Sequence, residues 1–282
     1  MNNAKTLFLM LVLSGLLLLV GAVLGGIGGL IIALILALAL NMFAYWSSDK
    51  IALRMAHAHP VTEREEPELY SIVAEQASLA SLPMPNVYAI DSDSPNAFAT
   101  GRNPQHATVA VTTGIRRILN REELGAVLAH EMAHVGNRDT LIMAVVATIA
   151  GAISMLAFMA QISALFGGTG GGRDRGQNFI GLLIIAIIMP LAAALVRAAI
   201  SRTREFQADA TGARTSGNPY ALASALEKLE TGSRARPMNV AEGASHLFIV
   251  NPLKGASMAN LFSTHPPTVE RARRLRDMRP NF

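Results

Sequence analysis

Residues 120–136 read NREELGAVLAHEMAHVG, a stretch with its own helix-start signal and a pair of spaced histidines. Asn120 followed three residues later by Glu123 is typical of a capping box, so the sequence predicts that a helix begins here. On a helix, His130 and His134 lie one turn apart and face the same way. Because two imidazoles in this arrangement can bind one Zn²⁺ ion, the stretch predicts a metal site on a helix.

Three carboxylates complete the predicted site. Glu131 projects about 100° away from the histidines, where it can take a proton from an attacking water. Farther along the chain, Glu205 is a credible third ligand, and Asp209, one helical turn later, could accept the N–H of a ligating histidine. A competing interpretation is that Glu205 and Asp209 only balance Arg202 and Arg204 at a membrane surface. The nearby histidine pair makes that interpretation the weaker one.

Charge is missing from the chain in long blocks rather than evenly. Hydrophobic residues make up 51% of the sequence and charged residues 16%, against about 25% charged in a soluble domain. No residue from Thr6 to Ser48 is charged. A single helix of that length would be about 65 Å long, roughly twice the hydrocarbon core of a bilayer. The sequence therefore predicts a hairpin of two spans, Leu7–Leu24 and Ile27–Trp46.

Two later blocks predict one span each, about Thr140 to Phe166 and Phe179 to Ala199, joined by a short non-cytoplasmic loop over 167–178. Four spans are thus expected. A cleaved signal peptide over Leu7–Val23 is disfavoured, because the apolar run is long and continues directly into a second one.

Basic residues near the span ends set the expected orientation. Most of them fall on one side of the membrane, which places both termini and both polar segments in the cytoplasm. The sequence pI near 9.8 therefore indicates lipid headgroups rather than nucleic acid as the partner of this charge. The absence of cysteine fits a reducing compartment.

Several short elements can be predicted in the polar segments. Helices are expected from a Thr62 capping box to about Leu82, from Asn218 to about Leu229, and from Pro266-Pro267 onward; strands are expected at Asn86–Ile90 and Ala107–Thr112. In the second strand, Val109 and Val111 lie just upstream of the histidine helix. This strand could offer an edge to which an extended substrate adds by main-chain hydrogen bonds.

The chain resembles the HtpX-type membrane zinc endopeptidases, relatives of the CAAX prenyl endopeptidases. The resemblance extends over essentially the whole length and rests on four motifs in order. They are PNAFATG at 95–101, HEMAH at 130–134, SRTREFQAD at 201–209 and THPP at 264–267.

The resemblance implies a mainly α fold. Four transmembrane helices would carry a cytoplasmic zincin-like α+β metalloprotease domain. The expected parts are a hairpin over 1–48, a first catalytic part over 49–139, two spans over 140–199 and a second catalytic part over 200–282. The protein would be a multi-pass protein of the bacterial inner membrane.

The resemblance also implies roles for residues. One zinc ion per chain would be held by His130, His134 and Glu205, with Glu131 as general base.

In the same family pattern, Asn96 would help to bind the substrate backbone. His265 and Arg271 would stabilise the oxyanion.

Three functions compete at this stage. The first is a stress-response protease that cuts misfolded or damaged membrane proteins at the cytoplasmic face. The second is a processing enzyme for one defined, conceivably lipidated, substrate. The third is a non-enzymatic membrane scaffold with a degenerate metal site, which the joint presence of ligands and base disfavours. The sequence leaves the oligomeric state open.

Overall fold

The computed structural model describes residues 2–142, 202–238, 247–250 and 266–278. The predicted third and fourth spans lie outside these residues, apart from the first three positions, 140–142. The predicted loop over 167–178 and His265 also lie outside them.

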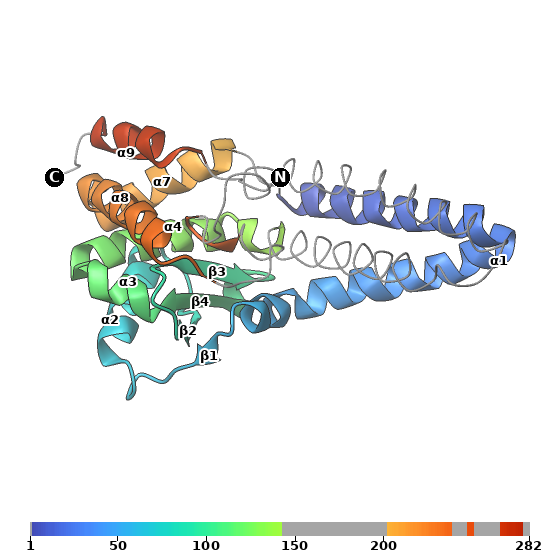
Figure 1. The fold of residues 1–282 in the computed structure, drawn as a ribbon, viewed down its shortest axis with the longest axis horizontal. Helices are drawn as coiled ribbons and strands as arrows, with labels where there is room; N and C mark the ends of the chain where they lie inside the picture. Colours follow the sequence, from blue (N-terminus) through green and yellow to red (C-terminus); the bar gives the residue numbers. More distant parts are fainter. Residues whose placement is uncertain (1, 143–201, 239–246, 251–265, 279–282) are drawn as a thin grey trace, which may run out of the picture.

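The first helix, α1 (Asn2–Met55), doubles back on itself (Figure 1). Gly26 has a φ of 56°, a left-handed conformation that suits glycine. The side chain of Asn41 donates to Ser14 Oγ at 2.7 Å, although the two residues are 27 apart in sequence. A straight helix would hold them about 40 Å apart, so the chain reverses between the two predicted spans.

Among the described helices, the segment Gly26–Ser47 is the one long and apolar enough to cross a membrane. The expectation of four spans is therefore not established by the described part of the chain.

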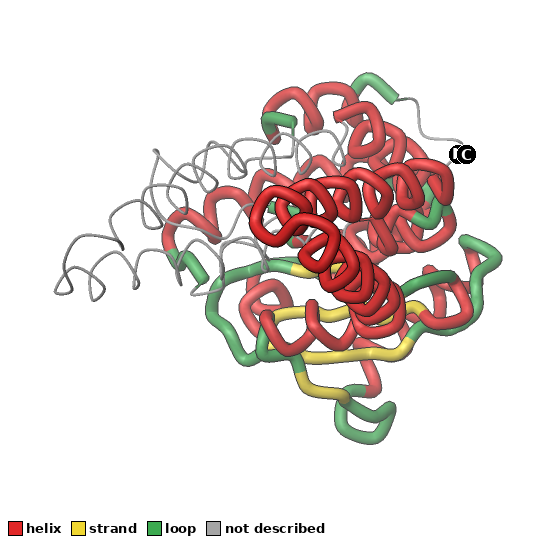
Figure 2. The backbone as a smooth tube through the Cα atoms, turned by 90° about the vertical axis from the view of Figure 1, so that its right-hand side faces the viewer, coloured by secondary structure: helices red, strands yellow, loops and turns green. Residues whose placement is uncertain are grey.

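A small mixed sheet lies beside the base of α1. Its strands are β1 (His59–Pro60), β2 (Asn86–Ile90), β3 (Ala97–Gly101) and β4 (Ala107–Thr112), in the order β1-β2-β4-β3. β2 and β4 are parallel, whereas β1 and β3 each run antiparallel to their neighbour. Figure 2 shows the strands side by side in one layer. The bounds predicted for β2 and β4 are confirmed, but β3 was not predicted.

The sheet is covered on both faces, because successive side chains of a strand point in opposite directions. On one face, Ile90, Phe98 and Ala110 belong to a core with the end of α1, at Ala52 and Leu53. The other face contributes to a larger core with the remaining helices. That core draws residues from both polar segments of the chain.

The helices that build this larger core are α2 (Pro67–Leu79), α3 (Thr113–Ile118), α4 (Arg121–Gly136), α7 (Arg202–Ser216), α8 (Pro219–Ala235) and α9 (Thr268–Arg276). The predicted capping box at Asn120 is confirmed at the start of α4. The described fold is thus mainly helical with a small mixed sheet, as expected.

The start predicted for α2 is wrong. Thr62 does bond to Glu65, whose Oε2 accepts from the backbone N–H and the hydroxyl of Thr62, each at 2.7 Å. These bonds close a turn, and the helix begins only at Pro67. A residue before proline is disfavoured in helical conformation, so Glu66 stays outside the helix.

Candidate metal centre

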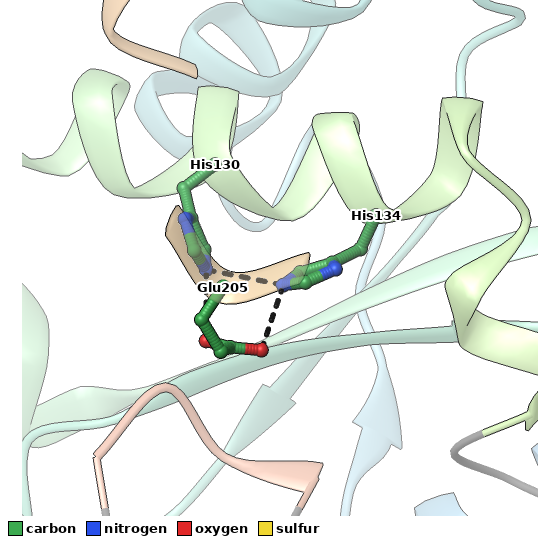
Figure 3. A group of neighbouring side chains, drawn as sticks. All are labelled: His130, His134 and Glu205. Carbon is green, nitrogen blue, oxygen red and sulfur yellow. Dashed lines mark hydrogen bonds and ion pairs between the residues drawn. The ribbon is translucent and has the colours of Figure 1, made fainter. Parts of the chain in front are cut away.

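The centre is built on α4, whose inner turns are buried. His130 and His134 have 1% and 4% of their surface exposed. Their Nε2 atoms lie 3.2 Å apart. Figure 3 shows both imidazoles leaving the same side of the helix. The spacing of the two histidines therefore produces the shared face that the sequence predicts.

Glu205 reaches the histidines from α7, which packs along α4. Its Oε1 lies 3.5 Å from His134 Nε2, and its Oε2 lies 3.9 Å from His130 Nε2. The carboxylate points at the two imidazoles in Figure 3. Residues from both polar segments of the chain thus meet at one point.

These three side chains fit a tetrahedral metal ion. Their ligand atoms all lie within 4.8 Å of one another. Bonds of 2.0–2.2 Å to nitrogen and oxygen would hold tetrahedral ligands about 3.3 Å apart, close to the separations between these atoms. Two imidazoles and one carboxylate form a donor set typical of catalytic zinc sites.

Each imidazole has a carboxylate behind it. Asp209 Oδ1 lies 3.0 Å from His130 Nδ1, and Asp139 Oδ2 lies 3.2 Å from His134 Nδ1. Such contacts fix the tautomer that leaves Nε2 free for a metal. The sequence analysis identified Asp209 but missed Asp139. The only signal for Asp139 is that it is the last charge before an uncharged block.

The charges around the histidines shift their pKa values in opposite directions. Burial lowers the pKa of His130, although Asp209 opposes this effect. Burial also disfavours the charged form of His134, but Asp139 and Glu205 outweigh it and raise its pKa to about 9.

Arg271 on α9 holds Asp209 with two hydrogen bonds. Its Nε donates to Oδ2 at 2.8 Å and its Nη2 donates to Oδ1 at 2.7 Å. Burial disfavours the Asp209 carboxylate, yet Arg271 and His130 keep its pKa well below the usual range. The third arm of the guanidinium, Nη1, donates to the Ile249 carbonyl at 3.3 Å. In the described structure Arg271 therefore orients Asp209.

Glu131 lies on the side of α4 that faces β3. Its Oε2 accepts from the backbone N–H of Ala99 at 2.8 Å. Burial raises the pKa of Glu131 to about 7, and the nearby His134 opposes this shift. A carboxyl group with this pKa can accept and return a proton near neutral pH.

The edge of the sheet beside the metal centre differs from the prediction. Val109 and Val111 were expected on an edge strand, but β4 pairs with β2 on one side and β3 on the other. The edge prediction is therefore wrong for these two valines. β3 is the edge strand beside the metal centre, and its uniformly buried residues lack the polar–apolar alternation that would have revealed it.

The outward groups of β3 can be assigned from its pairing. Thr112 N–H donates to Asn96 O at 3.0 Å, so the backbone of Asn96 faces β4. By the alternation of antiparallel pairs, Ala97 faces outward, and its carbonyl accepts from Ile249 N–H at 3.2 Å. The side-chain amide of Asn96 donates to the Val250 carbonyl at 2.8 Å. The Asn96 side chain is buried in this contact.

A glycine allows the two helices of the centre to approach. Gly212 lies on the same face of α7 as Glu205 and Asp209. A Cβ at Gly212 would lie 2.7 Å from the Cα and the backbone nitrogen of His130. The sequence analysis missed this residue, because only the packing of α7 on α4 gives it a role.

Comparisons with known proteins agree with this geometry. Peptidase family M48 matches residues 63–279. A protease HtpX homolog from Desulfatibacillum aliphaticivorans is 53% identical over 280 residues, covering 99% of this chain and 90% of the relative. One from Thermococcus kodakarensis is 52% identical over 273 residues, covering 96% and 94%.

A likeness in fold alone extends to a solved structure. The crystal structure of Ste24p from S. mikatae matches with a TM-score of 0.51 and 19% identity over 97% of this chain. The match spans 65% of the Ste24p chain.

The sequence resemblance to HtpX-type proteases is therefore confirmed. With a family match over most of its length and relatives of this identity, the chain belongs to peptidase family M48 and is a membrane metalloendopeptidase.

Proposed function

We propose that this chain is a zinc-dependent endopeptidase that hydrolyses misfolded or damaged membrane proteins at the cytoplasmic face, as part of a stress response. The observation that carries the proposal is the buried group of His130, His134 and Glu205, with Glu131 on the adjoining side of α4. One zinc ion per chain fits these side chains.

Zinc bound there would act as a Lewis acid and lower the pKa of water toward neutrality. The proton transfers belong to Glu131. It removes a proton from the attacking water and returns it to the leaving amine. In the metal-free site, burial raises its pKa to about 7, so that the carboxylate and the acid are both accessible there near neutral pH. The N–H of Ala99 holds one of its oxygens in place.

The substrate is proposed to add as an extended strand to the outer edge of β3. Ala97 and Ala99 turn their backbone groups to that edge. There the Ala97 carbonyl accepts from Ile249 N–H and the Ala99 N–H donates to Glu131, so the added strand would have to replace the contact with Ile249. Main-chain hydrogen bonds are indifferent to side chains, so this mode of binding permits many sequences.

Three further roles remain proposals. Asn96 is proposed to help bind the substrate backbone, which requires exchange of its contact with Val250. His265 and Arg271 are proposed to stabilise the developing oxyanion. Arg271 would combine this role with its hold on Asp209.

The proposed setting is the bacterial inner membrane, with both termini and the active site in the cytoplasm. Residues 49–139 and 200–282 would form the catalytic domain, and residues 140–199 would contribute two spans. The shared core of the two polar segments supports their assignment to one domain.

The test is to purify the full chain with bound zinc and sequence its products from an unfolded membrane protein and from a prenylated peptide. Glu131→Gln should keep the zinc and lose turnover, whereas His130→Ala should lose both. Retained peptidase activity in Glu131→Gln would overturn the role of the base. A single invariant product would favour the processing enzyme over quality control.

A further inference from the structure

The end of β3 meets two separate apolar blocks of the chain. The carbonyl of Gly101, its last residue, accepts a hydrogen bond from the Thr140 hydroxyl at 2.8 Å. The guanidinium of Arg102, the next residue, lies 4.6 Å from the centre of the Trp46 ring. Figure 1 shows β3 beside the base of the α1 hairpin.

Each of these contacts involves a residue near the end of an uncharged stretch of the sequence. Thr140 follows Asp139 directly and opens an uncharged block, whereas Trp46 ends the predicted span Ile27–Trp46, shortly before Asp49. Trp46 is 56% exposed and packs edge-on against Tyr45 at 5.5 Å. Exposed tryptophan and tyrosine at the end of a span are typical of the headgroup layer. With Gly26–Ser47 as a span, this arrangement would place the end of β3 at the membrane surface.

The catalytic carboxylate lies a short, fixed distance from that surface. Ala99, which holds Glu131, precedes Arg102 by three residues along β3, or about 10 Å. The distance from Trp46 to the sheet, measured along α1, is similar. The part of α1 that packs on the sheet begins at Ala52, six residues after Trp46 and about 9 Å along the helix axis.

We propose that Trp46 and Arg102 set the distance from the membrane at which this enzyme cuts. An anchored polypeptide whose cytoplasmic stub adds to β3 would present to Glu131 a peptide bond about three to five residues from its last embedded residue. The enzyme would then choose its bond by distance from the bilayer rather than by sequence. This inference rests on the proposed addition of substrate to β3, and it names the substrate class as the extended juxtamembrane segments of membrane-anchored polypeptides.

The first test measures the depth of Trp46 without any reaction. The chain has one tryptophan, so its fluorescence reports this position alone. The full-length protein is placed in vesicles of phosphatidylcholine and phosphatidylglycerol with bromine either near the ester groups or near the methyl ends of the acyl chains. Stronger quenching by the shallow bromines is expected. Equal quenching at both depths, or stronger quenching by the deep bromines, would overturn the proposal.

The second test maps cleavage sites. Model substrates carry one membrane span followed by a tail of uniform repeating sequence, and a second series moves a readily cut sequence outward along that tail. Mass spectrometry of the products should place the cuts within about five residues of the span in every substrate. Cuts that follow the moved sequence, or that spread evenly along the tail, would contradict the inference.

Variants test whether Trp46 and Arg102 produce this distribution of cleavage sites. Trp46→Ala and Arg102→Ala should widen the distribution of cut sites about twofold, because the anchor at the headgroup layer is weakened. Tyr220→Ala is the matched control, since Tyr220 is an exposed aromatic residue on α8. Its distribution should stay as narrow as that of the parent. An unchanged distribution in Trp46→Ala would contradict the inference.

A soluble unfolded protein, used as a further substrate, distinguishes failure of the proposed function from failure of the distance rule alone. If the enzyme cuts neither this protein nor the anchored substrates, the proposed function itself fails. If it cuts the soluble protein at many positions and the anchored tails with no fixed distance, only the distance rule fails.

Discussion

At the scale of single residues, the centre is a pair of matched histidine–carboxylate contacts. His130 has Asp209 behind it, and His134 has Asp139. Each carboxylate has a cationic partner of its own, Arg271 for Asp209 and Arg204 for Asp139. The orientation of the imidazoles therefore depends on residues that do not reach the metal position themselves.

Asp139→Asn should lower zinc affinity by about 10- to 100-fold, because it removes the charge that orients His134. Competition with a fluorescent chelator measures the affinity. Asp93→Asn is the matched control, since Asp93 pairs with Arg117 on the exposed surface and should leave the affinity unchanged. Equal affinities in the two variants would exclude a role for Asp139 at the centre.

Asp209→Ala should affect folding as well as metal binding. Arg271 is 1% exposed, and this substitution removes its hydrogen-bonded anionic partner and leaves only Glu205, whose Oε2 lies 3.9 Å from Nη2. Breaking a buried pair in this way costs about 3–5 kcal/mol of unfolding free energy. Denaturant unfolding of the metal-free protein measures the loss. A cost below about 1 kcal/mol would mean that the pair is effectively solvated.

At the scale of elements, the close packing of α7 on α4 decides whether the ligand atoms meet. Gly212→Ala should push the two helices apart, because a Cβ cannot occupy a position 2.7 Å from the backbone of His130. We expect zinc affinity to fall by at least about tenfold, since Glu205 moves with α7. In Gly136→Ala, the new Cβ meets Leu82 at an ordinary 3.7 Å. This control should retain the parent's affinity, and a similar loss in it would refute the packing argument.

A second contact between elements is sensitive to pH. Burial disfavours ionised Glu123 on α4, but hydrogen bonds from Lys228 and Ser224 on α8 outweigh burial and lower its pKa. Because the folded pKa lies below the unfolded one, the stabilisation is present above the unfolded pKa and is lost as pH falls through the folded pKa.

Glu123→Gln should therefore cost about 1 kcal/mol at neutral pH and almost nothing in strong acid. Urea unfolding at a series of pH values measures the difference from the parent. A cost that is the same at every pH would show that the ionised form of Glu123 contributes nothing.

Local signals explain which elements could be predicted from sequence. The capping box at Asn120 and the alternation of Val109 and Val111 act over a few residues, so α4 and β4 were predicted correctly. β3 was missed, because its residues are all buried and show no alternation, so that only the pairing with β4 identifies them as a strand.

The residues of the site can also be divided into those that local sequence signals predict and those that only the fold reveals. The histidine spacing is local, and Glu205 could be inferred because it follows the later apolar blocks. Asp139 lies five residues after His134, but its contact depends on the turn after α4, where Arg138 has a φ of 58°. Gly212 has its role only where α7 packs on α4, and no spacing in the sequence reveals that contact.

At the scale of the whole molecule, a metal ion would join two parts of the chain that are far apart in sequence. Removing it with a chelator should destabilise the protein, by about 4 kcal/mol relative to free zinc at a thousand times its Kd. Thermal unfolding in detergent with and without chelator measures the shift. Glu131→Gln should retain the shift and His130→Ala should lack it. A parent protein indifferent to chelation would contradict the assignment of the ligands.

The order of the chain also determines when the enzyme can become active. α4 carries the proposed base and two of the three side chains that could bind the metal, but the third lies on α7 beyond residues 137–201. A growing chain that has not reached Glu205 therefore lacks a complete centre, whatever has already folded. With these assignments, we expect the protease to be silent during its own synthesis and to gain activity only after the apolar blocks before α7 have been made and α7 has returned to α4. A membrane exposed to half-made copies of this chain would therefore be protected from their activity without any inhibitor or removable propeptide.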